Sequence, residues 1–266
     1  MSLVVAGGAA LGQRLGRNVR FASIGNGLGA ALMGACGYYI SNRAVFVLTA
    51  ALTIPALAAL VPLSRLDLGA PRQRRQSTGI EGLRRVLANR ALLVFAAAAM
   101  LFTLANAAML PLASIALTKR AGGIASLLIA ACVVLPQGIV AISSPWMGQA
   151  AETQGRRRVL LLGFLMLPLR GLLFAFVTSP PFVVAIQALD GIAAASFGVM
   201  VPLIAADVAG RSGHFNLVLG CVGLGIGIGA TVGTTVAGMI ADRFGDQAAF
   251  GSLALIGAAA SLLVWL

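Results

Sequence analysis

The chain has 266 residues, of which 59% are hydrophobic and only 10% are charged, and its formal net charge is +12. An average soluble domain has about 25% charged residues, and a soluble fold of this size could not bury so much apolar surface beneath a polar coat. The composition therefore excludes a soluble globular protein and predicts an all-α membrane protein, a polytopic helical bundle.

Apolar stretches long enough to cross ~30 Å of hydrocarbon recur along the chain, separated by short charged or Gly/Pro-rich breaks. The opening segment, 1–16, is too short to cross and lacks the basic start of a signal peptide, so we interpret it as the end of a span. None of the later stretches alternates polar and apolar residues as a barrel strand does. Eight spans are predicted, at 21–39, 44–63, 91–112, 124–146, 159–177, 182–204, 217–240 and 247–266.

The longest break, 64–90, separates two spans from six. It begins as a linker and ends in a short amphipathic stretch, 80–89, which we expect to form a helix along the membrane surface. This break is also the most basic one in the chain, with seven arginines between 65 and 90. We interpret it as a hinge between two helical bundles.

Lysine and arginine are divided unequally between the two sets of alternate breaks, with fourteen in one set and four in the other. The larger set occupies 14–20, 65–90, 156–158 and 211, and the smaller set occupies 43, 119–120 and 243. By the positive-inside rule the larger set faces the cytoplasm, and eight spans place the C-terminus there too. Anionic membrane lipid then accounts for the basic excess, and nucleic acid is not expected as a partner.

The loop GQAAETQGRRR, 148–158, resembles a loop signature of the major facilitator superfamily, G-x-x-[AL]-[DE]-x-x-G-R-[RK]. Thr153 replaces the basic residue that usually follows the acidic position. The stretches 14–34, 189–207 and 225–245 are similar to spans 5, 10 and 11 of bacterial members, although the first lacks the proline of proton-coupled drug antiporters. The signature positions are Gly148, Ala151, Glu152, Gly155, Arg156 and Arg157.

This resemblance implies an incomplete facilitator fold that corresponds to spans 5–12. Residues 1–63 would end the N-terminal bundle, 64–90 would be a cytoplasmic linker, and 91–266 would form the C-terminal six-helix bundle. The implied function is secondary transport of a small solute by alternating access, with efflux as the direction and a proton as a candidate coupling ion, in the bacterial inner membrane.

The alternative is a non-transporting truncated membrane protein or scaffold, because the solute path in such transporters lies between two halves. Transport would then need a partner that supplies the missing N-terminal half. The signature residues imply a gating loop at the cytoplasmic helix ends, formed by Gly148, Glu152, Gly155, Arg156 and Arg157. A plain topogenic arginine cluster is the competing interpretation of the same loop.

Two charges lie within predicted spans, Arg170 and Asp190. The break TSPP, 178–181, joins their helices, and at ~1.5 Å rise per residue both side chains lie roughly 10–14 Å below the outer surface. A lone charge at such depth costs ~2.5–3.5 kcal/mol or more, so we expect the two to pair. The pair either locks the two helices together or faces the pathway and binds solute or a proton.

Four amides within the predicted spans are further candidates. Gln187 precedes Asp190 by three residues and shares its helix face. Asn26, Asn106 and Gln137 either form interhelical hydrogen bonds or contact the solute. Gly225, Gly229 and Gly233 form a smooth stripe for close helix contact, and they lack the strand and lysine of a phosphate-binding loop.

Metal, cofactor and catalytic signals are not found in the sequence. The cysteines Cys36, Cys132 and Cys221 have no paired or metal-like spacing, and a single histidine, His214, cannot form a metal site alone. The chain shows no paired catalytic carboxylates and no Ser/His/Asp set. We therefore expect no cofactor and no enzymatic activity.

Overall fold

A computed structural model describes residues 11–61, 84, 88–210 and 214–266. Within these ranges the secondary structure is helical, which confirms the predicted all-α class. The helices are α2 (Leu11–Tyr39), α3 (Asn42–Ala58), α6 (Arg90–Asn106), α7 (Met109–Ala121), α8 (Ala125–Thr153), α9 (Arg156–Phe176), α10 (Pro180–Ala209), α11 (Phe215–Phe244) and α12 (Asp246–Trp265). Most of the predicted linker, 64–90, and its helix at 80–89 lie outside the described residues.

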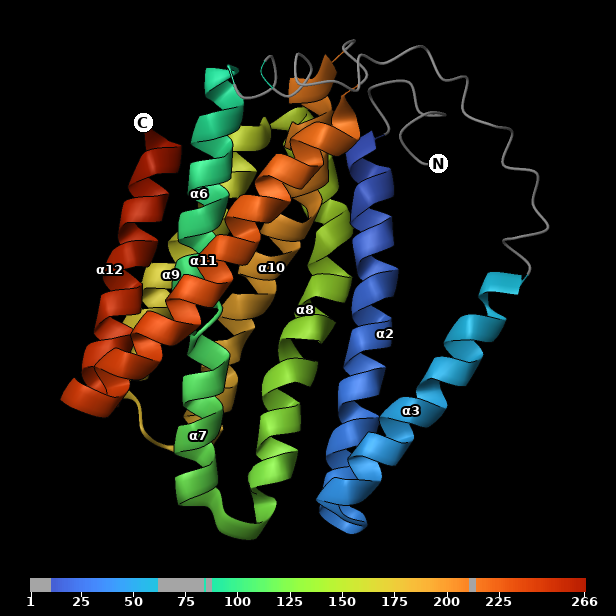
Figure 1. Ribbon diagram of the computed structural model, residues 1–266, viewed down its shortest axis with the longest axis vertical. Helices are drawn as coiled ribbons and strands as arrows, with labels where there is room; N and C mark the ends of the chain where they lie inside the picture. The colour runs from blue at the N-terminus through green and yellow to red at the C-terminus, as the bar shows by residue number, and fades with distance from the viewer. Residues whose placement is uncertain (1–10, 62–83, 85–87, 211–213) are drawn as a thin grey trace.

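Five helical stretches in the described ranges are long and apolar enough to cross a membrane, which is fewer than the eight predicted. The first of these stretches, Arg90–Thr153, is counted as one although it contains three helices, α6, α7 and α8. Its path reverses at the 3-10 turn η2 (Gly122–Ile124), as Figure 1 shows. The other two predicted spans correspond to α3, which has only 17 residues, and to α2, whose first turns carry three arginines.

The predicted span 91–112 is not one helix, because the chain breaks at Ala107 and Ala108 between α6 and α7. Pro111 explains this break. It has no N–H to donate to the carbonyl of Ala107, and its ring would clash with that carbonyl in a continuous helix. The amide of Ala107 still donates to the carbonyl of Thr103, so α6 closes with a regular final turn.

The helices α6 to α12 form one bundle, in which α6 and α7 run in the same direction and consecutive helices from α7 onward run antiparallel (Figure 1). In it α9 packs against α10 and α12, α11 packs against α6, and α2 packs on the outside against α8 and α10. The helix α3 contacts α2 and leans away from the bundle, and none of its residues is buried. The arginine-rich starts of α2, α6 and α9 lie at one end of the molecule, where α12 ends (Figure 1).

The predicted glycine stripe is where α11 meets α6. A methyl group on Gly225 would lie 2.9 Å from the carbonyl oxygen of Ala96, and one on Gly229 or Gly233 would overlap the carbonyls of Met100 or Leu104. The hydroxyl of Thr103 crosses the same contact and donates to the carbonyl of Ile226 at 3.1 Å. Small residues therefore let these two backbones approach closely, as predicted.

Candidate functional site

A polar layer divides the interior of the bundle into two apolar cores. On α9 the first core ends at Leu167 and the second begins at Phe174, and between α6 and α7 the boundary falls between Ala105 and Ala108. On α10 the same boundary lies between Ile186 and Ala193. The side chains at this level belong to Asn106, Arg170, Gln187 and Asp190, which we call the buried polar cluster.

Arg170 is the centre of the buried polar cluster and is only 2% exposed. Its Nη1 donates to Asp190 Oδ1 at 2.7 Å and to Asn106 Oδ1 at 2.6 Å, while Nη2 donates to Gln187 Oε1 at 2.6 Å. The guanidinium also lies 5.4 Å from the ring centroid of Phe174. The predicted pairing of Arg170 with Asp190 is therefore present, and two of the four candidate amides join it.

The local sequence explains why these groups converge. Gln187 and Asp190 are three residues apart and so share one face of α10, while Phe174 follows Arg170 by four residues on α9. Asn106 is the last residue of α6, so its amide lies at the helix break that Pro111 causes. The C-terminal end of a helix carries partial negative charge, which favours the Arg170 guanidinium beside it.

The buried polar cluster is not fully satisfied. Arg170 Nε and Gln187 Nε2 are buried donors with no oxygen or nitrogen partner among the described residues, although the Gln187 side chain lies beside the Cys132 thiol. The Asp190 side chain is 20% exposed, in contrast to its partner. An unmade hydrogen bond of a buried donor costs about 1–3 kcal/mol, so a ligand that carries acceptor oxygens would gain by meeting these two groups.

The signature loop also forms tertiary contacts, at the end of the bundle where α8 stops and α9 begins. Gly155 adopts φ +94°, a conformation that favours glycine, and thereby reverses the chain between the two helices. Arg156 follows directly, and its Nε donates to Asp207 Oδ2 on α10 at 3.0 Å. Arg157 Nε donates to the carbonyl of Val264, near the end of α12, at 3.1 Å.

The same loop holds α2 against α8. Glu152 Oε1 accepts a hydrogen bond from the amide of Gly12 at 2.7 Å, and Gly148 lies against the carbonyl of Gly12. One turn deeper, the buried hydroxyl of Ser144 donates to the carbonyl of Gly16 at 2.9 Å. The residues predicted as a gating loop therefore connect α2, α10 and α12 to the turn between α8 and α9.

Two other candidate residues take no part in the buried polar cluster. The hydrogen bonds of the described residues do not join Asn26 or Gln137 to it. Asn26 is exposed and lines a crevice between α2, α3 and α8, and the Cβ of Gln137 lies 3.3 Å from the position of a methyl group on Gly27. Both residues therefore belong to the contact between α2 and α8.

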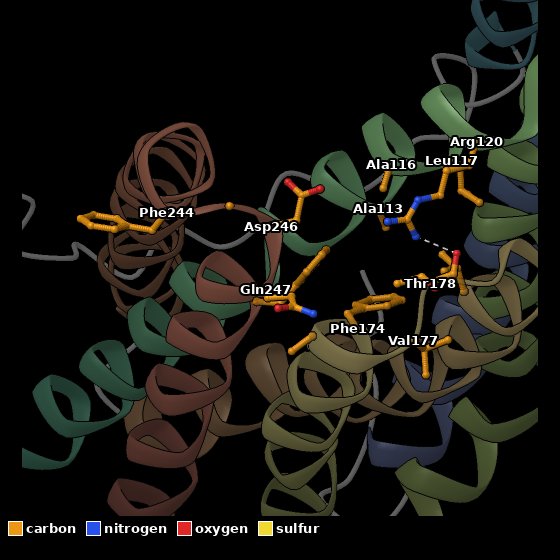
Figure 2. Close-up of a pocket in the computed structure, with 14 residues that line it drawn as sticks. Ala113, Ala116, Leu117, Arg120, Phe174, Val177, Thr178, Phe244, Asp246 and Gln247 are labelled. Atoms are coloured by element: carbon orange, nitrogen blue, oxygen red, sulfur yellow. Dashed lines mark hydrogen bonds between the residues drawn. The ribbon is translucent and has the colours of Figure 1, made fainter.

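A cavity of about 330 Å³ lies at the opposite end of the bundle from the signature loop. Figure 2 shows its polar lining, in which Arg120 donates to the carbonyl of Thr178 at 2.8 Å and Asp246 and Gln247 lie nearby. Phe174 forms part of its wall. Because Phe174 also contacts Arg170, its ring separates this cavity from the buried polar cluster.

Comparison with known families gives a match to the sequence model of the Major Facilitator Superfamily over residues 98–266, which is more than half of the chain. The chain belongs to this superfamily. The match covers the helices that supply all four residues of the buried polar cluster. It also covers the whole signature loop, so the resemblance inferred from GQAAETQGRRR is confirmed.

Two relatives of this facilitator chain are described as uncharacterized MFS-type transporters, from Mycobacterium tuberculosis strains CDC 1551 and H37Rv. Each is 37% identical over 260 residues, which is 94% of this chain and 62% of the relative. The chain thus spans less than two thirds of the length of these relatives. It is a multi-pass integral membrane protein of transporter type.

Sequence reasoning missed two residues of the facilitator chain that the structure brings to these sites. Asp207 pairs with Arg156, and the signal was present, since both lie at helix ends assigned to the same membrane face. Phe174 was not singled out, although its spacing from Arg170 places it on the same helix face. The ion pair of Arg156 with Asp207 could not be assigned without knowing that these ends of α9 and α10 meet.

Proposed function

We propose that the chain is part of a secondary active transporter that moves a small solute by alternating access, in the direction of efflux. The observation that carries this proposal is the buried polar cluster at the level of the helix break. In transporters, discontinuous helices near the bilayer midplane form solute and ion sites, because their free backbone ends and polar side chains meet there. An apolar bundle that needed only stability would not require a charge there.

In this proposal Asp190 and Gln187 bind the solute, and Arg170 orients both. The partial exposure of Asp190 supports direct access to this carboxylate from the solute path. The two donors without partners, Arg170 Nε and Gln187 Nε2, favour a solute with acceptor oxygens. Asp190 is also the candidate proton acceptor, since it is the only carboxylate in the buried polar cluster.

In this proposal the signature loop acts as the gate of the solute path. Contacts of Glu152 with Gly12, and of Arg156 with Asp207, hold helix ends together in the present conformation. Release of these contacts would let the helices at this end separate. We assign this end to the cytoplasm, together with the C-terminus, in the bacterial inner membrane, because it carries the arginine-rich helix starts.

We further propose that 91–266 is one six-helix bundle, that 64–90 is a cytoplasmic linker, and that 1–63 belongs to a second bundle. The solute path would run between the two bundles, so transport needs helices that complete the second one. We infer no enzymatic role, because the buried polar cluster has one carboxylate and no nucleophile paired with a base. The competing proposal is a membrane scaffold that transports nothing.

A ligand-stabilisation screen with the purified protein in detergent tests the solute site. A ligand at 100 times its Kd adds about 2.7 kcal/mol to the free energy of unfolding, which raises the unfolding temperature measurably. We expect a sugar, organic acid or drug to give such a shift in the wild-type chain. The shift should be lost in Asp190→Asn and retained in Asp242→Asn, a matched change at an exposed carboxylate.

Two results would count against the solute site. One is a screen in which no solute class shifts the unfolding temperature of the wild-type chain. The other is a shift of equal size in the wild-type, Asp190→Asn and Asp242→Asn proteins, since the ligand would then bind elsewhere. The first result would favour the scaffold interpretation.

A further inference from the structure

A second cavity, which we call the basic crevice, lies at the end of the bundle where α6 and α9 begin. Its volume is about 630 Å³, and its walls come from α6, α9, α10 and α12. Three arginines, Arg90, Arg156 and Arg157, line it together with one acidic side chain, Asp207, and the last residue of the chain, Leu266. It does not overlap the buried polar cluster.

The charges of the basic crevice do not cancel. Asp207 is already paired with Arg156 at 3.0 Å. The ion pairs of the described residues leave Arg90 and Arg157 without a carboxylate partner. Arg157 is held in place because its Nε donates to the carbonyl of Val264, which leaves its terminal nitrogens free to bind an anion. Two positive charges without a carboxylate partner among the described residues therefore remain at the rim.

The walls below this rim are apolar. Val94 and Ala98 lie one and two turns below Arg90 on α6, and Leu160 lies one turn into α9. Leu263 contributes the facing wall from α12. The basic crevice thus has cationic side chains at the level of the helix starts and hydrocarbon side chains deeper along the same helices. This order matches an amphiphile with a negative headgroup, and a fully polar anion would gain nothing from the apolar walls.

We propose that the basic crevice binds an anionic phospholipid, with the phosphate between Arg90 and Arg157 and an acyl chain along Val94 and Leu263. Basic pockets between membrane helices at the cytoplasmic face bind acidic headgroups on this principle. The free amides at the start of α9, which no side chain caps, add partial positive charge at the same level. The site is independent of the solute path and rests only on the membrane orientation proposed above.

Native mass spectrometry of the purified chain, titrated with phosphatidylglycerol or phosphatidylcholine, tests the headgroup contact. We expect phosphatidylglycerol to bind more tightly than phosphatidylcholine. Each arginine near an anionic surface contributes roughly fivefold to affinity, so R90Q/R157Q should weaken phosphatidylglycerol binding by roughly 30-fold. R158Q removes an exposed charge that does not line the basic crevice, and it should change the affinity by less than about twofold.

A second pair of variants tests the acyl contact without touching the arginines. Val94→Trp fills the basic crevice, whereas Leu93→Trp places the same side chain on the neighbouring exposed position outside it. We expect Val94→Trp to reduce phosphatidylglycerol binding about tenfold or more and Leu93→Trp to leave it unchanged. Unfolding temperatures measured without added lipid check that every variant folds.

Three outcomes would overturn the proposal. Equal effects of R90Q/R157Q and R158Q would mean general surface attraction. Inorganic phosphate that displaces phosphatidylglycerol at comparable concentration, together with an unaffected Val94→Trp, would mean a phosphate site without a lipid. No preference for phosphatidylglycerol over phosphatidylcholine would remove the basis for the site. None of these results bears on solute binding at Asp190, so the two proposals fail separately.

Discussion

Arg170 depends on its neighbours inside the bundle, because a guanidinium that is only 2% exposed cannot form its hydrogen bonds with water. Asp190 supplies the opposite charge, and Asn106 and Gln187 supply neutral acceptors. Breaking a buried pair costs far more than the pair itself contributes, because one charge is left uncompensated. The stability of the buried polar cluster should therefore depend on the balance of charge between Arg170 and Asp190.

A double-mutant cycle on Arg170→Met and Asp190→Leu tests this balance. Each single change should lower the free energy of unfolding by about 3–5 kcal/mol, since it leaves a buried polar partner unpaired. The double variant should lose much less stability than the sum of the two single losses, because apolar side chains then fill the layer and no charge is left unpaired. Denaturant unfolding in detergent, followed by circular dichroism, measures all three.

Asp207→Leu is the control for this cycle, because Asp207 belongs to an ion pair whose side chains are 32% and 49% exposed. An exposed pair contributes about 0–1 kcal/mol, so its loss should be small. Strict additivity of the Arg170 and Asp190 effects would contradict the account. It would show that the two side chains do not interact in the folded protein.

At the scale of elements, glycine spacing decides how closely helices pack. The stripe on α11 that faces α6 has no room for a methyl group at Gly229 or Gly233. Two residues from Gly229, Gly227 has no atom within 4 Å of the position that a methyl group would occupy. One helix therefore offers both a constrained and an unconstrained glycine.

We predict that Gly229→Ala destabilises the protein by about 1–3 kcal/mol, since the added methyl group forces α6 and α11 apart. Gly227→Ala should be neutral or should stabilise by up to about 1 kcal/mol, because alanine favours the helix. The same denaturant experiment compares the two. Equal effects at both positions would mean that α11 does not pack on α6 through this stripe.

Composition and the length of the apolar stretches were sufficient to predict the helical class. The pairing of Arg170 with Asp190 and the glycine stripe could also be predicted, because each follows from spacing on one helix or on consecutive helices. The break between α6 and α7 was missed, although Pro111 signals it, because the apolar run continues through it. The ion pair of Arg156 with Asp207 required knowledge of which helix ends meet. The basic crevice uses four helices and could not be derived from spacing.

At the scale of the whole molecule, the proposed membrane orientation rests on the distribution of charge. The starts of α2, α6 and α9 gather at one end (Figure 1), while the start of α3 and the ends of α7 and α11, which carry Arg43, Lys119, Arg120 and Arg243, lie toward the other. A helical membrane bundle with this bias places the richer end in the cytoplasm. The gate, the basic crevice and the depth of the buried polar cluster are all assigned relative to this orientation.

Cysteine labelling in intact cells tests that orientation most directly. In a background where Cys36, Cys132 and Cys221 are replaced by serine, Thr178→Cys reports the turn between α9 and α10, and Gln154→Cys reports the turn between α8 and α9. A membrane-impermeant maleimide should label Thr178→Cys in intact cells and Gln154→Cys only after permeabilisation. Labelling of Gln154→Cys in intact cells, with Thr178→Cys protected, would contradict the orientation and the sites assigned from it.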